Sequence, residues 1–146
     1  MLLSDIQQEW EKDSKIDELN LGREALKTPS LHSKYLSYLS KARLLQRKAE
    51  SEYLNTRRLK YRYYRGEMGK TELESTGWVQ FQGTKPLKNE MDEYLQCDKD
   101  LIELQDKIEY YKTIFYTLEQ IIKSVNARSW DIKSSMDWQK FTNGVM

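Results

Sequence analysis

The segment that follows Pro29 most restricts how this chain can fold, because neither glycine nor proline occurs in it before Gly66. Apolar or small residues recur along it mostly at alternating steps of four and three, at Leu31, Tyr35, Tyr38, Ala42, Leu45, Ala49, Tyr53, Thr56 and Tyr63. This heptad-like seam is typical of a long helix that lies along a partner helix. Thr28 and Pro29 indicate where the helix begins, since proline at the first helical position loses no hydrogen bond.

A second long helix is expected from Lys88 onward. Its apolar residues alternate three and four apart, at Leu101, Leu104, Ile108, Tyr111, Phe115, Leu118, Ile122 and Val125. Ile102, Ile114 and Ile121 form a second strip beside them, and so wide an apolar surface favours packing within an oligomer as well as within the chain. Residues from Arg128 to Phe141 are expected to form a last short amphipathic helix.

The remaining segments are shorter. Ser4 and Gln7 have the spacing of a capping box, which predicts an N-terminal helix that extends to about Glu18. Glycines and Pro86 interrupt the middle of the chain, where Trp78–Gln82 alternates weakly and is expected to form a short strand or hairpin arm. The predicted fold class is therefore mainly α, with long amphipathic coiled-coil-like helices and a glycine-rich central loop or small β-hairpin.

Composition limits the kind of protein. A chain of 146 residues is long enough for about one domain with its own core. Cys97 is the single cysteine, so no internal disulfide can form and a reducing interior is expected. No run approaches the roughly 18 apolar residues of a membrane span, and the N-terminus lacks a basic region followed by an apolar run. We therefore expect a cytoplasmic protein.

The segment Arg57–Gly66, RRLKYRYYRG, carries five basic residues and three tyrosines with no acidic residue, in a chain whose net charge is only +1. Such a concentration of charge is typical of polyanion binding. Tyrosines between the cations suggest a single-stranded nucleic acid, because unpaired bases stack on aromatic rings. We refer to these ten residues as the basic segment.

Helical phasing at about 100° per residue places the arginines Arg43, Arg47, Arg58, Arg62 and Arg65 on one face, roughly opposite the seam. Arg57 and Lys60 fall at the edges between the two faces. A line of guanidinium groups can contact several phosphates, without sequence preference and with strong salt dependence. The residues alone leave open an ordinary solvated helix face, although the repulsion among unpaired like charges favours polyanion binding.

No catalytic residue, metal site or cofactor is expected. Gly66–Thr71 resembles a phosphate-binding loop, but Tyr64 stands where that motif requires glycine and no strand precedes it. His32 is the only histidine, so neither a histidine-rich metal site nor a serine–histidine triad can form. Asp98 and Asp100 would point about 200° apart on a helix, which favours a structural or capping role over metal binding.

The order of several short motifs carries a resemblance to a known family. They include Asp5–Glu9, Ser33–Leu36, Arg58–Lys60, Tyr63–Gly66, Asp98–Asp100 and Ile122–Ser124. In their order and spacing the chain resembles the UvsY family, the recombination mediators of T-even phages. The segment Thr71–Leu87 departs from that pattern, since it is longer and richer in Gly, Trp and Phe, and its role stays open.

The resemblance implies a non-catalytic accessory protein in the cytoplasm of a phage-infected host. Proteins of this family bind single-stranded DNA and contact both a RecA-type phage recombinase and the phage single-strand-binding protein. They help the recombinase displace that protein and nucleate a presynaptic filament, in recombination, replication and repair. They act as ring-like homo-oligomers, heptameric in the family, and the C-terminal helical region drives assembly. The alternatives are a helical scaffold that binds only protein partners and, less favoured, an enzyme.

The resemblance also assigns residues. The family's DNA-contacting Lys-x-Arg pair falls on Arg58 and Lys60, with the two cation types exchanged. The full set of expected DNA-binding residues is Arg57, Arg58, Lys60, Tyr61, Arg62, Tyr64 and Arg65. Residues 1–87 are expected to form the DNA-binding region and residues 88–146 the oligomerisation region. The expected oligomerisation residues are Leu118, Ile121, Ile122, Val125, Trp130, Ile132, Met136 and Trp138.

Overall fold

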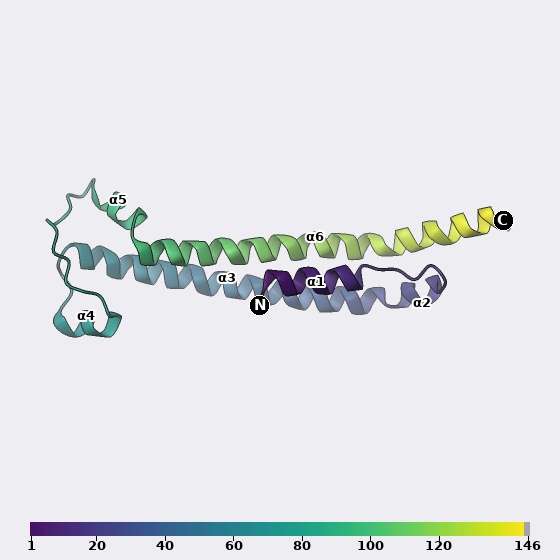
Figure 1. Ribbon diagram of the computed structural model, residues 1–146, viewed down its shortest axis with the longest axis horizontal. Helices are drawn as coiled ribbons and strands as arrows, with labels where there is room; N and C mark the ends of the chain where they lie inside the picture. The colour runs from purple at the N-terminus through teal and green to yellow at the C-terminus, as the bar shows by residue number, and fades with distance from the viewer. Residues whose placement is uncertain (145–146) are drawn as a thin grey trace. The chain divides into compact units, whose positions relative to one another are not determined.

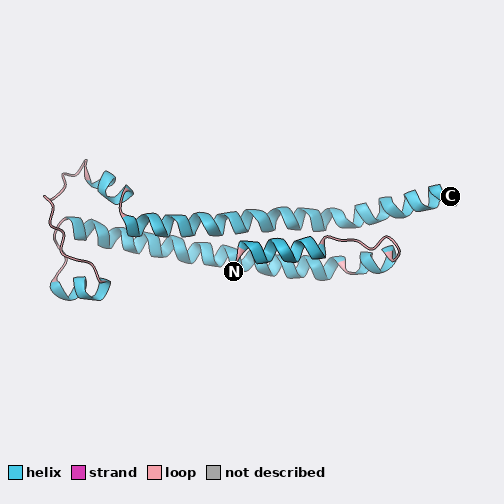
Figure 2. Cartoon of the chain, in the orientation of Figure 1, coloured by secondary structure: helices cyan, strands magenta, loops and turns pink. Residues whose placement is uncertain are grey.

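The computed structural model describes residues 1–144, which form six α-helices joined by loops (Figure 1). The helices are α1 (Leu3–Asp13), α2 (Leu21–Leu26), α3 (Thr28–Tyr64), α4 (Lys70–Thr76), α5 (Met91–Gln96) and α6 (Lys99–Thr142). No strand occurs in this part of the chain (Figure 2), so the mainly α prediction is confirmed. None of the helices among the described residues is both long and apolar enough to span a membrane.

The chain forms two compact units, and each contains part of α3 and part of α6. The first unit comprises Met1–Leu44 and the residues from Tyr111 onward, and the second comprises Leu45–Tyr110. These boundaries differ from the functional regions expected at 1–87 and 88–146. Those two regions were defined by DNA binding and assembly, so they stay a prediction.

The core of the first unit is built from three helices. Ile6 of α1 packs with Tyr35 and Ala42 of α3 and with four buried aliphatic residues of α6, Ile114, Leu118, Ile121 and Val125. Trp10 of α1 meets the Tyr35 ring edge-on at a centroid distance of 5.4 Å. Burying each large aliphatic side chain stabilises the fold by about 1.5–3 kcal/mol. The core residues of α3 and α6 belong to the two predicted apolar seams and to the strip beside the second seam, so within this unit these surfaces pack against each other.

Polar contacts fix α1 to α3. The Lys34 ammonium lies 2.7 Å from Asp13 and 3.0 Å from Glu9, and the hydroxyls of Tyr35 and Tyr38 donate to the same two carboxylates. Burial raises the pKa of Asp13, but hydrogen bonds from Lys34 and Tyr35 outweigh it and leave that pKa below its ordinary value. The ionised cluster therefore stabilises the fold near neutral pH.

A buried ion pair fixes α2 to α6. The Arg128 guanidinium lies 2.6 Å from the Glu24 carboxylate and also donates to the Glu24 carbonyl and, at 3.0 Å, to the Thr28 hydroxyl. Both charged side chains are almost fully buried. Because a buried charge is stable only when it is paired, this contact fixes α2 and the start of α3 against α6.

The second unit has a smaller core. Met91 and Leu95 of α5 and Leu101 of α6 pack against Tyr53 and Tyr64 of α3.

The long helix predicted after Pro29 is confirmed. α3 begins at Thr28, as expected, and its apolar seam is buried or half-buried at every predicted position.

The end of α3 is confirmed as well, because Gly66 stops the helix two residues beyond Tyr64. Its φ of +70° is one that residues with a Cβ rarely adopt. The Glu67 N–H donates to the Arg62 carbonyl at 3.0 Å, which completes a Schellman C-cap.

Of the two alternatives predicted for the centre of the chain, the glycine-rich loop is confirmed and the strand at Trp78–Gln82 is wrong. This segment is irregular in the structure, and its two aromatic residues do not alternate between opposite faces. Instead Trp78 and Phe81 both pack against Tyr63. A strand also needs a partner for its backbone groups, and no strand among residues 1–144 provides one.

The N-terminal helix begins and ends earlier than expected. α1 starts at Leu3 without a side-chain cap, so the capping box at Ser4 and Gln7 is wrong. The helix ends at Asp13 rather than near Glu18. The Asp17 carboxylate accepts from the Leu19 N–H and the Asn20 side chain, which favours a turn over another helical turn.

The C-terminal region also differs from the prediction. Helix does not run unbroken from Lys88, since α5 ends before Cys97 and α6 begins at Lys99. Asp98 lies at this break, and its carboxylate accepts from the Leu101 N–H at 3.0 Å. The expected capping role of Asp98 is thus confirmed. The segment from Arg128 to Phe141 is not a separate helix, because α6 continues through it to Thr142 without a glycine or proline.

Candidate nucleic-acid interface

The basic segment forms the last turns of α3 in the second unit, and its arginines differ in how they are paired. Arg58 is exposed and forms no ion pair with any of residues 1–144. Arg57 is also exposed, and its only carboxylate contact within that range is a long one, 3.8 Å to Asp92. These two guanidinium groups are therefore accessible to a ligand.

Arg62 and Arg65 are half-buried and already have partners. Both terminal nitrogens of Arg62 donate to the Glu72 carboxylate, at 2.7 and 2.9 Å, in the paired geometry that guanidinium and carboxylate groups favour. This hydrogen bonding raises the pKa of Arg62 and lowers that of Glu72. Arg65 forms an ion pair with Glu67 at 3.0 Å and lies over the Tyr61 ring.

Lys60 does not lie at the edge of the exposed arginine face, which corrects the position expected from helical phasing. Its side chain is only 7% exposed, and its ammonium lies 2.8 Å from Asp100 and 3.2 Å from Asp98. The same ammonium lies 3.9 Å from the centre of the Trp78 ring. Both carboxylates reach it because Asp98 precedes α6 rather than forming part of a helical turn, so the expected 200° separation does not apply.

An aromatic cluster covers the end of α3 beside Lys60. The Tyr64 ring lies 5.0 Å from Phe81 and 5.4 Å from Tyr94. Burial and a 2.6 Å hydrogen bond to Asp98 raise the pKa of Tyr64 well above its ordinary value. Tyr63 packs on Trp78 in the same cluster. Tyr61 is more exposed than these two tyrosines, so it is the better placed to stack on a base.

Sequence reasoning missed the groups that surround the basic segment. Glu72 on α4 and Asp92 on α5 contact its arginines, while Trp78 and Phe81 in the connecting loop cover Lys60 and the tyrosines. The tryptophan and phenylalanine in a glycine-rich segment were a usable signal of packing. The acidic residues gave none, since no periodic spacing relates them to α3.

The residues expected to form the oligomer interface fall into two groups. Leu118, Ile121, Val125 and Ile132 are buried within the first unit, and Ile122 is half-buried. Trp130 is 69% exposed and Trp138 is 64% exposed, and Met136 is also exposed. Phe141 is exposed too and stacks on Trp138 at 5.8 Å. We call Trp130, Trp138 and Phe141 the C-terminal aromatic patch.

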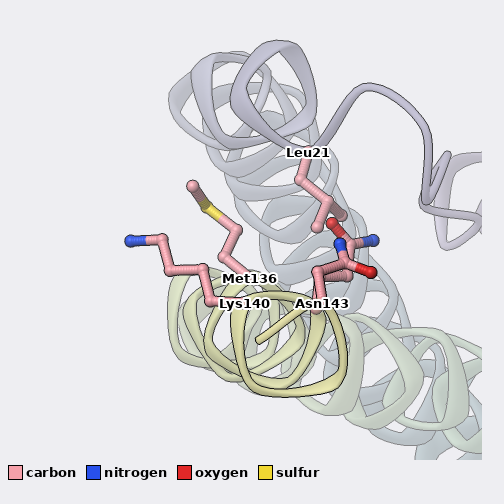
Figure 3. Close-up of a pocket in the computed structure, with 5 residues that line it drawn as sticks. Leu21, Met136, Lys140 and Asn143 are labelled. Carbon is pink, nitrogen blue, oxygen red and sulfur yellow. The ribbon is translucent and has the colours of Figure 1, made fainter. Parts of the chain in front are cut away.

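A small cavity lies near this end of α6. It has a volume of about 250 Å³ and is lined by Leu21, Met136, Gln139, Lys140 and Asn143. Figure 3 shows Leu21 of α2 facing Met136 and Asn143 across it. The lining carries one cation and no acidic residue, and its shallow form gives no reason to assign it a ligand.

The structure thus defines an all-helical protein in which the apolar seams of α3 and α6 pack within the chain. The basic segment lies at the end of α3. Comparison with known proteins identifies the family. Residues 9–145 match the family described as "Recombination, repair and ssDNA binding protein UvsY". The chain therefore belongs to the UvsY family.

Individual relatives agree with this assignment. The chain is 27% identical over 146 residues to "Recombination protein uvsY" of Enterobacteria phage T4, and the match covers 99% of each chain. Two crystal structures of the bacteriophage T4 recombination mediator protein UvsY, in lattice types II and IV, are each 25% identical to it. Their TM-scores are 0.82 and 0.83, with 98% of both chains covered in the first and 97% and 99% in the second. The family resemblance expected from the motifs is confirmed.

Proposed function

We propose that this protein is a recombination mediator that binds single-stranded DNA and helps a RecA-type recombinase load onto DNA coated by a single-strand-binding protein. The observation that carries the proposal is the exposure of Arg57 and Arg58 in the cation-rich end of α3, in a chain of a family described by recombination, repair and single-stranded DNA binding. Like the family, it is proposed to act without catalysis, in the cytoplasm of an infected host.

The proposed contacts follow from exposure. Arg57 and Arg58 bind phosphates directly, because their guanidinium groups are exposed and at most weakly paired. Arg62 and Arg65 join them when their carboxylate partners give way. Tyr61 stacks on a base, which is worth about 1–3 kcal/mol in such sites. Such binding is insensitive to sequence, as a mediator requires.

Lys60 and Tyr64 are assigned a different role from the one expected. Both contact Asp98, and Lys60 also contacts Asp100, so these groups join the end of α3 to the start of α6. They hold the helix end on which Arg58 and Tyr61 stand. In this proposal Lys60 and Tyr64 act as positioning residues, and the single-stranded DNA contacts Arg57, Arg58 and Tyr61.

Self-association would strengthen a weak site. A single strand that crosses several protomers gains affinity through effective concentration, without any new kind of contact. We propose that the C-terminal aromatic patch contributes to a homo-oligomeric ring, heptameric as in the family. Aromatic side chains are enriched at protein interfaces, and Trp130, Trp138 and Phe141 are all exposed.

Fluorescence anisotropy with a labelled oligothymidylate tests the DNA site. We expect Arg58→Ala to weaken binding and to reduce the slope of log K against log salt by about 0.7 for each phosphate that is no longer neutralised. Lys123→Ala is the matched control, because Lys123 is exposed on α6 in the first unit and its substitution removes the same charge. An unchanged affinity and slope for Arg58→Ala, or an equal loss of affinity for Lys123→Ala, contradicts the assignment.

The loading step needs a separate experiment. Recombinase filament formation is followed on single-stranded DNA that is first saturated with a single-strand-binding protein. The wild-type protein is expected to shorten the lag before filaments form, and Arg58→Ala to lengthen it again. DNA binding without any effect on the lag would refute the mediator role and leave the DNA-binding role intact.

A scaffold that binds only proteins is the second candidate, and the C-terminal aromatic patch favours it. Sedimentation with and without a labelled oligonucleotide separates the two. A mediator is expected to carry the oligonucleotide at low salt and release it at high salt, because its phosphate contacts are screened. A scaffold would sediment without the oligonucleotide at every salt concentration and would keep its protein partners in molar salt.

A further inference from the structure

The carboxylates that pair with the basic segment come from residues that follow it in the chain. Glu72 of α4 holds Arg62, Glu67 lies beside Arg65, and Asp92 of α5 lies at the longer distance of 3.8 Å from Arg57. The segment has no acidic residue of its own, yet three of its four arginines face an acid in the folded chain. These acids therefore neutralise much of the positive charge of the basic segment in the folded chain.

A carboxylate and a phosphate bind a guanidinium group through the same donors. The two terminal nitrogens of Arg62 both donate to Glu72, so a phosphate cannot take the same paired geometry while Glu72 remains bound. We propose that Glu72, assisted by Glu67, is an internal competitor of the DNA backbone and lowers the affinity of the site. This inference rests on the proposed DNA-binding function.

The accessibility of the Arg62–Glu72 pair makes the exchange possible. Its side chains are 37% and 42% exposed, whereas the Lys60 side chain is 7% exposed within its own ion pairs. A phosphate can thus approach Arg62 from solvent, and the Glu72 carboxylate can turn into water when it is released. When the strand leaves, the same carboxylate takes Arg62 back, which suits a protein that must hold DNA and later yield it.

Glu72 also has a fixed position from which to compete. It lies in the first turn of α4, three residues after Gly69, the N-cap of that helix. Its pKa lies below the ordinary value, first because of the hydrogen bond from Arg62. It is therefore ionised at neutral pH and remains close to Arg62 even when the pair opens.

The test compares two substitutions on the same helix. Glu72→Gln removes the charge that pairs with Arg62. Glu74→Gln removes the same charge from an exposed residue that forms no ion pair within residues 1–144. In anisotropy titrations with oligothymidylate we expect Glu72→Gln to tighten binding by about two- to fivefold, the range of an exposed ion pair. Glu74→Gln should give a clearly smaller gain, because it frees no donor and its charge is screened by salt.

Repeating the comparison in an Arg62→Ala background isolates the exchange. Without the guanidinium group, Glu72→Gln is expected to give no more gain than Glu74→Gln, as a double-mutant cycle requires. Far-UV circular dichroism confirms that helix content is unchanged. Arg62→Ala without any second substitution frees Glu72 and also removes the donors for which the phosphate competes, so it is expected to bind no tighter than wild type.

The outcomes separate this inference from the function on which it rests. Equal gains from Glu72→Gln and Glu74→Gln, a gain that persists without Arg62, or weaker binding by Glu72→Gln would each overturn the competition. In those cases the wild-type protein still binds the oligonucleotide, so the proposed function stands. A wild-type protein that does not bind the oligonucleotide at low salt removes both.

Discussion

Replacing Lys60 by alanine is expected to destabilise the protein rather than only to weaken DNA binding. Its ammonium lies 2.8 Å from Asp100 and 3.2 Å from Asp98, and the Trp78 ring covers it. The Asp98 side chain is itself only 4% exposed. Lys60→Ala therefore leaves a buried carboxylate without its cation, which is more destabilising than the removal of an exposed ion pair.

The size of the effect follows from what remains around Asp98. Removing one partner of a buried ion pair costs about 3–5 kcal/mol in general. Asp98 keeps hydrogen bonds from the Tyr64 hydroxyl and the Leu101 N–H, and Asp100 is half-exposed and can turn to water. We therefore expect a loss of about 2–4 kcal/mol in the free energy of unfolding, which lies toward the lower part of that range.

Urea unfolding followed by circular dichroism measures this loss. With a slope of about 2 kcal/mol per molar urea, the midpoint falls by about 1–2 M. Wild type and variant are compared at equal protein concentration, because the proposed self-association would add a concentration-dependent term to the stability. Arg58→Ala is the matched control on the same helix. Its side chain is exposed, so we expect a change within about 0.5 kcal/mol.

A double-mutant cycle makes the reasoning refutable. In Lys60→Ala the uncompensated charge is on Asp98, so adding Asp98→Asn removes that charge and should restore part of the lost stability. Asparagine still offers an oxygen to the Leu101 N–H. A midpoint for Lys60→Ala that matches that of Arg58→Ala, or fully additive effects of Lys60→Ala and Asp98→Asn, would show that Lys60 is not held by a buried carboxylate.

Two further predictions concern the first unit. The pKa of Asp13 is lower in the folded state than in the unfolded state, because Asp13 pairs with Lys34 and Tyr35. This pairing stabilises the fold fully at a pH above the unfolded-state pKa, and the stabilisation is lost as the pH falls through the folded-state pKa. Wild type should therefore lose more thermal stability than Asp13→Asn between about pH 5 and pH 2, and parallel losses by the two proteins would contradict this. Replacing Trp130 and Trp138 together by serine should lower the oligomer mass in sedimentation while helix content stays the same, and an unchanged mass would exclude this surface from assembly.

Much of the fold could be predicted from periodicity and breakers. The extent of α3 followed from Pro29, Gly66 and the absence of breakers between them. At two boundaries that were predicted wrongly, an aspartate accepts hydrogen bonds from groups two or three residues further along the chain, a turn or cap signal that hydrophobic periodicity does not include. Asp17 ends the N-terminal region in a turn, and Asp98 interrupts the C-terminal helix by capping α6.

The candidate site was predicted less completely. The basic segment was found by its composition, and the exposure of Arg58 agrees with its phasing. Lys60 was misplaced because phasing treats a helix as if it had a single buried stripe. Here Trp78 covers one side of the helix end and the start of α6 contributes two carboxylates, so a residue at the edge of the stripe became buried.

Local sequence was enough to predict the extent of α3, the seams that pack within the chain, and the place where positive charge is concentrated. Periodicity and charge are properties of residues close together in the chain, so they are readable without a structure. Which of the cations remain free to bind a ligand depends on contacts between distant parts of the chain. Pairing of Lys60 with Asp98 and of Arg62 with Glu72 joins residues 38 and 10 positions apart, and such pairing depends on how the chain folds back on itself.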